Sequence, residues 1–234
     1  MAEIARSITY HFRFADGDEK TFRVCLDPQT LAVVDPPRES PPEWTRLSVH
    51  QCRNCPLDPA LHPRCPIAVR VVDLVEAFRD SVSFEDVEVE VQANQRTYVR
   101  RTSLQKGLSS ILGVYTVSSG CPIMNKLRPM VANHLPFASA AETTYRTIAM
   151  YLLAQYFRKR WGAAPDFELR ELPEMFDAIR EVDVGLCERL GALGIQDASL
   201  NALAILTTFG EDVTFTVLDE HLESWEEVFR EHYG

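Results

Sequence analysis

Half of the cysteines in this chain lie in one short loop. Residues 50–66, HQCRNCPLDPALHPRCP, contain Cys52, Cys55 and Cys65 together with two histidines and four prolines. A C-x2-C pair lets one tight turn direct both sulfurs at a single metal ion, and Cys65 follows close enough to reach the same centre. Thiolate and imidazole are the ligands that zinc and iron–sulfur centres use. The loop therefore predicts a metal site.

A fourth cysteine, Cys121, lies in SSGCPIMNKLRP, immediately before proline and an apparent helix. The positive end of a helix dipole would favour its thiolate. Cys55 and Cys65 also precede proline, which fixes φ and stiffens the backbone around a ligand. A terminal Cys-Pro occurs in one ferredoxin cluster motif as well. Cys121 is therefore the candidate for the fourth ligand.

Three interpretations of these cysteines remain open. The leading one is a [4Fe–4S] cluster held by Cys52, Cys55, Cys65 and Cys121. The second is a structural zinc site formed by the three loop cysteines with either His50 or Cys121, although only one C-x2-C half is present. The third is a set of reduced thiols with no metal. Cys25 and Cys187, each beside apolar residues of a strand or helix, are interpreted as core thiols.

Apart from the cysteines, the sequence contains few residues whose pattern indicates catalysis or ligand binding. The common hydrolase, zinc-protease and nucleotide-binding fingerprints are absent from the sequence. Downstream of Cys121, Asn125, Lys126, Arg128 and His134 could bind an anion or move a proton if a substrate reached the cysteines. They could equally form a solvated helix face. The sequence gives no catalytic residue and leaves open whether the protein is an enzyme.

Composition and charge limit the class of protein. The chain has 234 residues, 46% of them hydrophobic and 25% charged, which is typical of a globular domain. It shows no apolar run long enough to span a bilayer and no signal-peptide pattern, so we expect no membrane partner and a reducing cytoplasm. The net charge of −10 disfavours nucleic acid as a partner.

The charge is unevenly distributed. Residues 163–234 carry 17 acidic and 4 basic side chains, whereas residues 1–162 carry 17 acidic and 20 basic ones. The acidic C-terminal helices could contact a protein partner or a second copy of the chain. A basic segment in the first part, with Arg96, Arg100, Arg101 and Lys106, predicts either a solvated strand face or an anion pocket.

The elements that must position these residues follow from hydrophobic periodicity. Apolar residues alternate over 8–14 and 22–26 around the ADGDEK turn, and again over 87–92 and 96–102 around ANQ, which predicts two hairpins. Residues 30–35 predict a third strand. After the cysteine loop, one helical face is formed by Ile67, Val71, Val72, Val75 and Phe78.

The pattern of the remaining residues, 103–234, predicts helices. Ser139 and Glu142 have capping-box spacing before a long helix, which we expect to be the central buried one. Apolar faces over 172–190 and 218–229 predict two more, with the second face buried. Strands followed by helices indicate an α+β fold. We expect one compact unit, with an antiparallel sheet region at 1–102 and a helical region at 103–234.

Three stretches resemble an uncharacterised bacterial domain family: HQCRNCPL, RTSLQKGLSSILGVYTVSSGCPIMNKLRPM and HLPFASAAETTYR. The family pattern is an H-x-C-x-x-C-P-L loop with a downstream S-G-C-P motif, and the resemblance extends over nearly the whole chain. No activity is known for this family. The resemblance therefore implies a single unit but no substrate and no catalytic residue.

Overall fold

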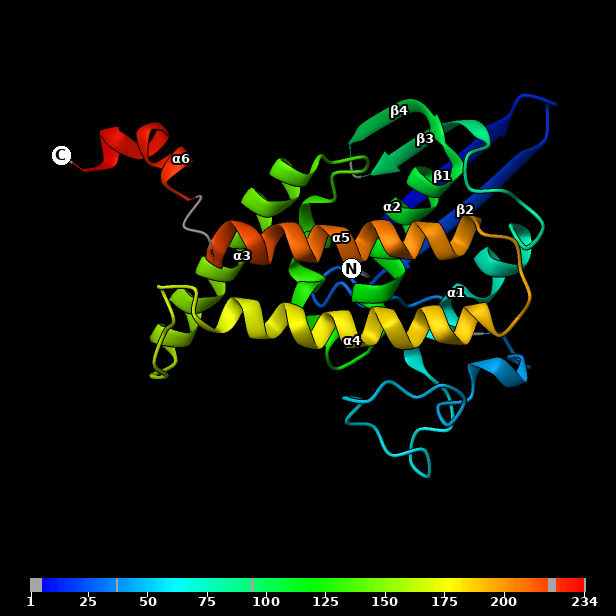
Figure 1. The fold of residues 1–234 in the computed structure, drawn as a ribbon, viewed down its shortest axis with the longest axis horizontal. Coiled ribbons are helices and arrows are strands. Elements are labelled where there is room, and N and C mark those ends of the chain that lie inside the picture. Colours follow the sequence, from blue (N-terminus) through cyan, green and yellow to red (C-terminus); the bar gives the residue numbers. More distant parts are fainter. Residues whose placement is uncertain (1–5, 37, 94, 219–221, 234) are drawn as a thin grey trace, which may run out of the picture.

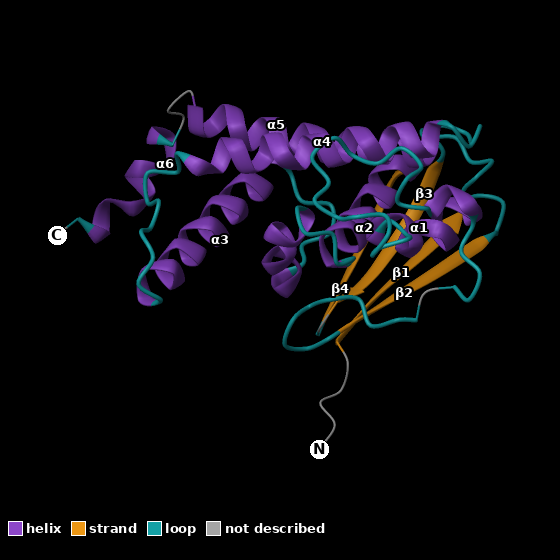
Figure 2. Cartoon of the chain, turned by 90° about the horizontal axis from the view of Figure 1, so that it is seen from below, coloured by secondary structure: helices purple, strands orange, loops and turns teal. Residues whose placement is uncertain are grey.

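The computed structural model describes residues 6–36, 38–93, 95–218 and 222–233 (Figure 1). Two hairpins form one antiparallel sheet with the strand order β2-β1-β3-β4, which confirms the two predicted hairpins. The strands are β1 (Arg6–Phe14), β2 (Glu19–Leu26), β3 (Asp86–Ala93) and β4 (Arg96–Ser103). Alternation along β1 buries Ile8, Tyr10 and Phe12 on one face of the sheet. Figure 2 shows the strands gathered at one side of the molecule.

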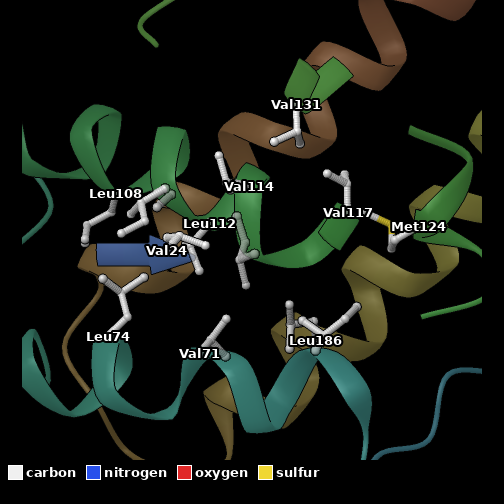
Figure 3. Packing of buried hydrophobic residues seen from close by; sticks show 14 of the residues in the cluster. Val24, Val71, Leu74, Leu108, Leu112, Val114, Val117, Met124, Val131 and Leu186 are labelled. Atoms are coloured by element: carbon white, nitrogen blue, oxygen red, sulfur yellow. The ribbon is translucent and has the colours of Figure 1, made fainter. Parts of the chain in front are cut away.

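Helices follow the strands and complete the expected α+β architecture. The longer ones are α1 (Pro66–Ala77), α2 (Leu104–Ser118), α3 (Ala140–Arg160), α4 (Glu171–Gly191) and α5 (Ala198–Leu218). The short ones are η1 (Glu43–Thr45), η2 (Met124–Asn133), α6 (Glu223–Glu226) and η3 (Glu227–His232). Sheet and helices share one hydrophobic core, in which side chains from β2, α1, α2 and α4 meet (Figure 3).

The central helix is α2, not α3. At Gly107, α2 lies so close to the sheet that an added Cβ would come within 2.9 Å of Phe12 Cε1 and of Val89 Cγ2. The prediction that α3 is the central buried helix was wrong, because Leu153 and Tyr156 are half exposed and its buried face includes Thr144 and Thr147. Its predicted capping box is confirmed: the Glu142 N–H donates to Ser139 Oγ at 3.2 Å.

The pair α4–α5 lies across the other helices (Figure 1). The predicted apolar face of α4 is buried, but α5 was missed, because its many β-branched residues resemble a strand. Its threonines satisfy their hydroxyl groups inside the helix: Thr208 Oγ1 donates to the Ala204 carbonyl oxygen at 3.0 Å, and Thr216 Oγ1 to that of Asp212 at 2.8 Å.

Two smaller predictions were also wrong. Residues 30–35 do not form a strand; Val33 makes an isolated bridge with Leu26, and the Asp35 carboxylate accepts a hydrogen bond from the Cys25 N–H at 2.7 Å just before proline ends the pairing. The apolar face predicted over 218–229 does not lie on one buried helix. Residues 219–221 lie outside the described part, and Val228 is 77% exposed. Within the described residues, no helix is long and apolar enough to cross a membrane.

Candidate metal centre

One small cavity is lined by the four predicted cysteines, Cys52, Cys55, Cys65 and Cys121. Its volume of about 20 Å³ is room for roughly one water-sized sphere. The rest of its wall is apolar, apart from one arginine. Those wall residues are Leu47, Leu57, Pro66, Ile67, Ile123, Val182 and Arg189. The structure thus brings cysteines from two distant segments together, whereas His50, the predicted alternative ligand, is not part of this wall.

The first two cysteines lie in a tight turn that is fixed against α4. The Cys55 N–H donates to the Cys52 carbonyl oxygen at 3.0 Å, as expected for a C-x2-C turn. Between them, Asn54 Nδ2 donates to the Ala178 carbonyl oxygen of α4 at 2.8 Å. The Gln51 side chain closes the loop by donating to the Leu57 carbonyl oxygen at 3.0 Å. These bonds hold the loop in place without using any thiol.

Cys65 is the N-cap of α1, and Pro66 occupies the first helical position, where proline needs no hydrogen-bond donor. The Cys65 N–H donates to the Thr45 carbonyl oxygen at 2.8 Å. The thiol therefore lies at the positive end of a twelve-residue helix, where the dipole stabilises negative charge.

Cys121 follows a turn at Gly120, whose φ of 100° favours glycine. Burial raises the pKa of the Cys121 thiol, and the backbone N–H groups of Met124 and Ile123 act in the opposite direction. The predicted helix after Cys121 is the 3-10 segment η2, so direct N–H contacts replace the expected α-helix dipole. Such contacts stabilise a thiolate.

Cys52 is packed against α4. A Cβ added at Gly185 would lie only 2.7 Å from Cys52 Sγ, so glycine is what allows this approach. The thiol faces the Val182 carbonyl oxygen at 3.9 Å. Burial, followed by the proximity of Cys65, Cys55 and Cys121, raises the pKa of Cys52 to about 12. This mutual influence is a second sign that the four thiols are neighbours.

Arg189 completes the cavity and was missed from the sequence. Its side chain is 2% exposed and donates to backbone carbonyl oxygens of the preceding segment. The acceptors are Trp44 (2.6 Å), Arg46 (2.7 Å), Leu47 (3.5 Å) and His50 (3.2 Å). Within the described residues it forms no ion pair with a carboxylate. Burial lowers the pKa of Arg189, and Cys65, Cys52 and Cys55 raise it. Its place on the apolar face of α4 is visible in the sequence, but the carbonyl acceptors that allow its burial are not.

In the positions that they occupy in this structure, the four thiols do not form a metal-binding geometry. Among the residues that the structure describes, no group of three or more histidine, cysteine, aspartate or glutamate side chains has a geometry that could hold a metal ion. The Cys52 thiol lies 3.9 Å from the Val182 carbonyl oxygen. Binding of a single metal ion would therefore require the thiols to move relative to one another, and binding of a cubane would also require the cavity of about 20 Å³ to widen.

The other predicted residues lie outside this cavity. Arg128 donates to the carbonyl oxygens of Thr30 at 3.4 Å and Val117 at 3.5 Å, and Lys126 is not part of the cavity wall. His134 Nε2 lies 2.6 Å from the Tyr10 hydroxyl. Burial, with smaller effects of Arg146 and Arg6, lowers the pKa of His134 to about 3, so the imidazole is neutral at physiological pH.

A family model for a domain of unknown function, DUF6901, matches residues 8–230. The chain belongs to the DUF6901 family. The match extends from β1 to η3 and thus includes the cysteine cavity, Arg189 and every long helix. It confirms the resemblance to an uncharacterised domain family. No curated protein and no solved structure matches the chain significantly. The family itself assigns no activity to the cavity.

Proposed function

We propose that this DUF6901 domain holds a [4Fe–4S] cluster with Cys52, Cys55, Cys65 and Cys121 and uses it for redox sensing or electron transfer. One observation carries the proposal: cysteines from two distant segments line a single apolar cavity together with a buried arginine. A reducing cytoplasm, where cysteines are not consumed in disulfides, is the proposed location.

The charge of Arg189 supports an anionic centre. Four neutral thiols would leave this buried guanidinium with carbonyl oxygens as acceptors but with no anionic partner among the described residues. A cluster held by four thiolates has a net negative charge that would offset the arginine. The positive helix end at Cys65 and the N–H groups facing Cys121 act in the same direction.

The apolar wall supports a redox role over hydrolytic chemistry. Leu47, Leu57, Ile67, Ile123 and Val182 surround the thiols, and in the described part of the chain no acidic or histidine side chain that could activate water lines this cavity. Electron transfer needs no substrate at the metal, and an apolar surrounding with few hydrogen bonds to sulfur tunes a cluster's reduction potential.

The second candidate is a non-catalytic interaction module with structural zinc at the same four cysteines. The small cavity favours it, because a single ion needs less space than a cubane. Exposed aromatic side chains at the end of α3 favour contact with a protein partner or a second copy: Tyr156 in the helix is 50% exposed, and Trp161, its C-cap, is 81% exposed.

Anaerobic purification followed by iron, sulfide and zinc analysis tests the proposal. A cluster predicts iron and sulfide in equal amounts and a broad absorption at about 400 nm. The iron and sulfide content and the absorption should be lost in Cys65→Ser and Cys121→Ser. They should be retained in Cys25→Ser, which changes a cysteine of β2 outside the cavity. Stoichiometric zinc in a colourless protein would select the second candidate. Folded protein that contains no iron, no sulfide and no zinc would leave free thiols and overturn both the cluster and the zinc proposal.

A further inference from the structure

A second, much larger cavity lies among the helices. Its volume is about 560 Å³, within the range of roughly 300–1,000 Å³ that is usual for sites of small organic ligands. Segments from β4, α2, η2, α3, α4 and α5 form its wall, which is largely apolar. Its apolar side chains include Val114, Leu127, Phe176, Ile179, Phe209 and Val213. None of the four cysteines lines it, so it is a separate site.

One of the charged side chains in this largely apolar wall is Asp183 of α4. Its side chain is 3% exposed and has no hydrogen bond or ion pair with any described residue. Burial alone raises the pKa of Asp183 to about 7. Buried polar groups nearly always have a partner, because an unpaired one costs free energy. A carboxyl group that lines a large cavity without a partner indicates that the partner is a ligand.

Asp183 also lines a second cavity, whose wall carries more acidic than basic side chains. This neighbouring cavity of about 500 Å³ is lined by Asp183 together with Asp177, Glu211 and Arg180. Arg180 there is already paired, at 3.5 Å, with Asp177. The acidic side chains of this neighbouring cavity favour a cation on its side of Asp183, whereas the wall of the larger cavity has three basic side chains besides Asp183 and Glu142.

The basic side chains of the larger cavity come from other elements. Arg100 belongs to β4, Lys106 to the first turn of α2, and Arg146 to α3. Two of them already donate hydrogen bonds, Arg146 to the Met130 and Asn133 carbonyl oxygens and Arg100 to that of Phe137. None of the three forms a hydrogen bond or an ion pair with Asp183, so they do not supply the partner that Asp183 lacks.

We propose that this cavity binds a small organic amine with an apolar body, whose ammonium group pairs with the Asp183 carboxylate. The ammonium supplies both the charge and the hydrogen-bond donors that the carboxylate lacks. The rings of Phe176 and Phe209 line the same cavity, and aromatic rings attract organic cations. The apolar body of the ligand would pack against the apolar wall between α2 and α5.

A matched series of three probes tests this inference on the purified full chain at pH 8. The probes are 4-phenylbutylamine, 4-phenylbutanol and 4-phenylbutyrate, which share an apolar body and differ in the terminal group. Titration calorimetry should show binding of the amine about tenfold or more tighter than that of the alcohol, because a charge-assisted bond replaces a neutral one. Preferential binding of the carboxylate, or equal binding of amine and alcohol, would overturn the proposal.

Two variants locate the binding. Asp183→Asn keeps the shape and removes the charge, so it should abolish the preference for the amine. Glu174→Gln changes an exposed carboxylate of the same helix that lines neither cavity, and it should alter the amine's Kd by less than about twofold. Unchanged amine binding in Asp183→Asn would contradict the assignment. Since the probe series uses the unmodified chain, the test stands even if a variant does not fold.

Discussion

Arg189 donates a hydrogen bond of 2.6 Å to the carbonyl oxygen of Trp44, a residue 145 positions earlier in the chain. The same guanidinium binds the carbonyl oxygens of Arg46 and His50, so one side chain of α4 fixes the path of the backbone that leads into the cysteine loop. The position of Cys52 therefore depends on a helix near the other end of the sequence.

Replacement of Arg189 by methionine should destabilise the metal-free protein by roughly 2–4 kcal/mol, because several buried carbonyl groups lose their donor. Urea unfolding measures this change. Arg189→Lys should lose less stability than Arg189→Met, since a cation and part of the hydrogen-bond donors remain. Arg180→Met, at an exposed position of the same helix, is the control and should stay within about 0.5 kcal/mol. Equal stability of all three variants would refute a structural role for Arg189.

Gly185→Ala should displace the cysteine loop. The new Cβ would lie 2.7 Å from Cys52 Sγ and 3.2 Å from Cys52 Cα, and the backbone atom cannot move away by rotation. We expect a loss of roughly 1–3 kcal/mol, typical of overpacking, together with lower metal content after reconstitution. Gly191→Ala in the same helix meets nothing within 4 Å and should be neutral or slightly stabilising. If Gly185→Ala behaved like Gly191→Ala, close packing of Cys52 on α4 would be wrong.

Metal removal should lower the melting temperature of the protein by several degrees. A centre that joins the loop around Cys52 to Cys121 closes a long segment of chain, and a ligand that binds only the native state stabilises it. Calorimetry of the holo and chelated protein measures the shift. Cys121→Ser should melt like the chelated protein and respond no further to chelator, whereas Cys25→Ser should retain the shift. The same melting curve with and without chelator would favour free thiols.

Asp183 should make stability depend on pH in a defined direction. Its folded pKa of about 7 lies above the ordinary aspartate value of about 3.9, so the folded chain holds a proton that the unfolded chain has released. The stabilisation is complete below about pH 4 and is lost as pH rises through about 7. Asp183→Asn cannot lose this proton.

The stability of Asp183→Asn relative to the natural chain should therefore increase by about 1.4 kcal/mol per pH unit, at most, between roughly pH 5 and 7. Urea unfolding at several pH values measures it. His134 has the opposite sign, because its lowered pKa destabilises the fold as pH falls below about 6.5, but it is present in both proteins and cancels. A pH-independent difference would show that Asp183 is not buried as a carboxyl group.

Self-association through α3 is the fifth expectation. If a second copy covers exposed aromatic side chains such as Trp161, light scattering should show a dimer that persists from about 50 mM to 500 mM salt, since apolar contacts are not screened. Trp161→Ser should weaken it. A dimer lost at high salt would instead indicate contact between acidic C-terminal helices and the basic 96–106 segment. A monomer under all conditions would exclude both.

Local sequence signals predicted the elements whose stabilisation is local. The alternation of Ile8, Tyr10 and Phe12 suffices to define β1, because one face of an antiparallel strand is buried. Ser139 and Glu142 suffice to begin α3, because a capping box is formed within four residues. The helix α5 was missed for the opposite reason: its β-branched residues disfavour a helix locally, and packing against α2 and α4 overrides that preference.

The cysteines could be found by type and spacing, but their surroundings could not. Arg189 and Asp183 are charged residues on a helix with an apolar face, and sequence alone does not show which charged residues turn inward. Arg189 can be buried because carbonyl oxygens more than 130 positions away accept its hydrogen bonds. Such partners are determined by the assembled fold rather than by neighbours along the chain.

Val182 and Asp183 are consecutive residues of α4 that belong to different cavities: Val182 lines the cysteine cavity, and Asp183 lines the large one. A single helical turn is therefore a wall shared by both sites. Any occupant that moves this turn at one site changes the shape of the other. Binding at the two sites would then be thermodynamically linked, and each occupant would change the affinity of the other by the same factor. Measuring amine affinity in metal-loaded and metal-free protein would give that coupling factor directly.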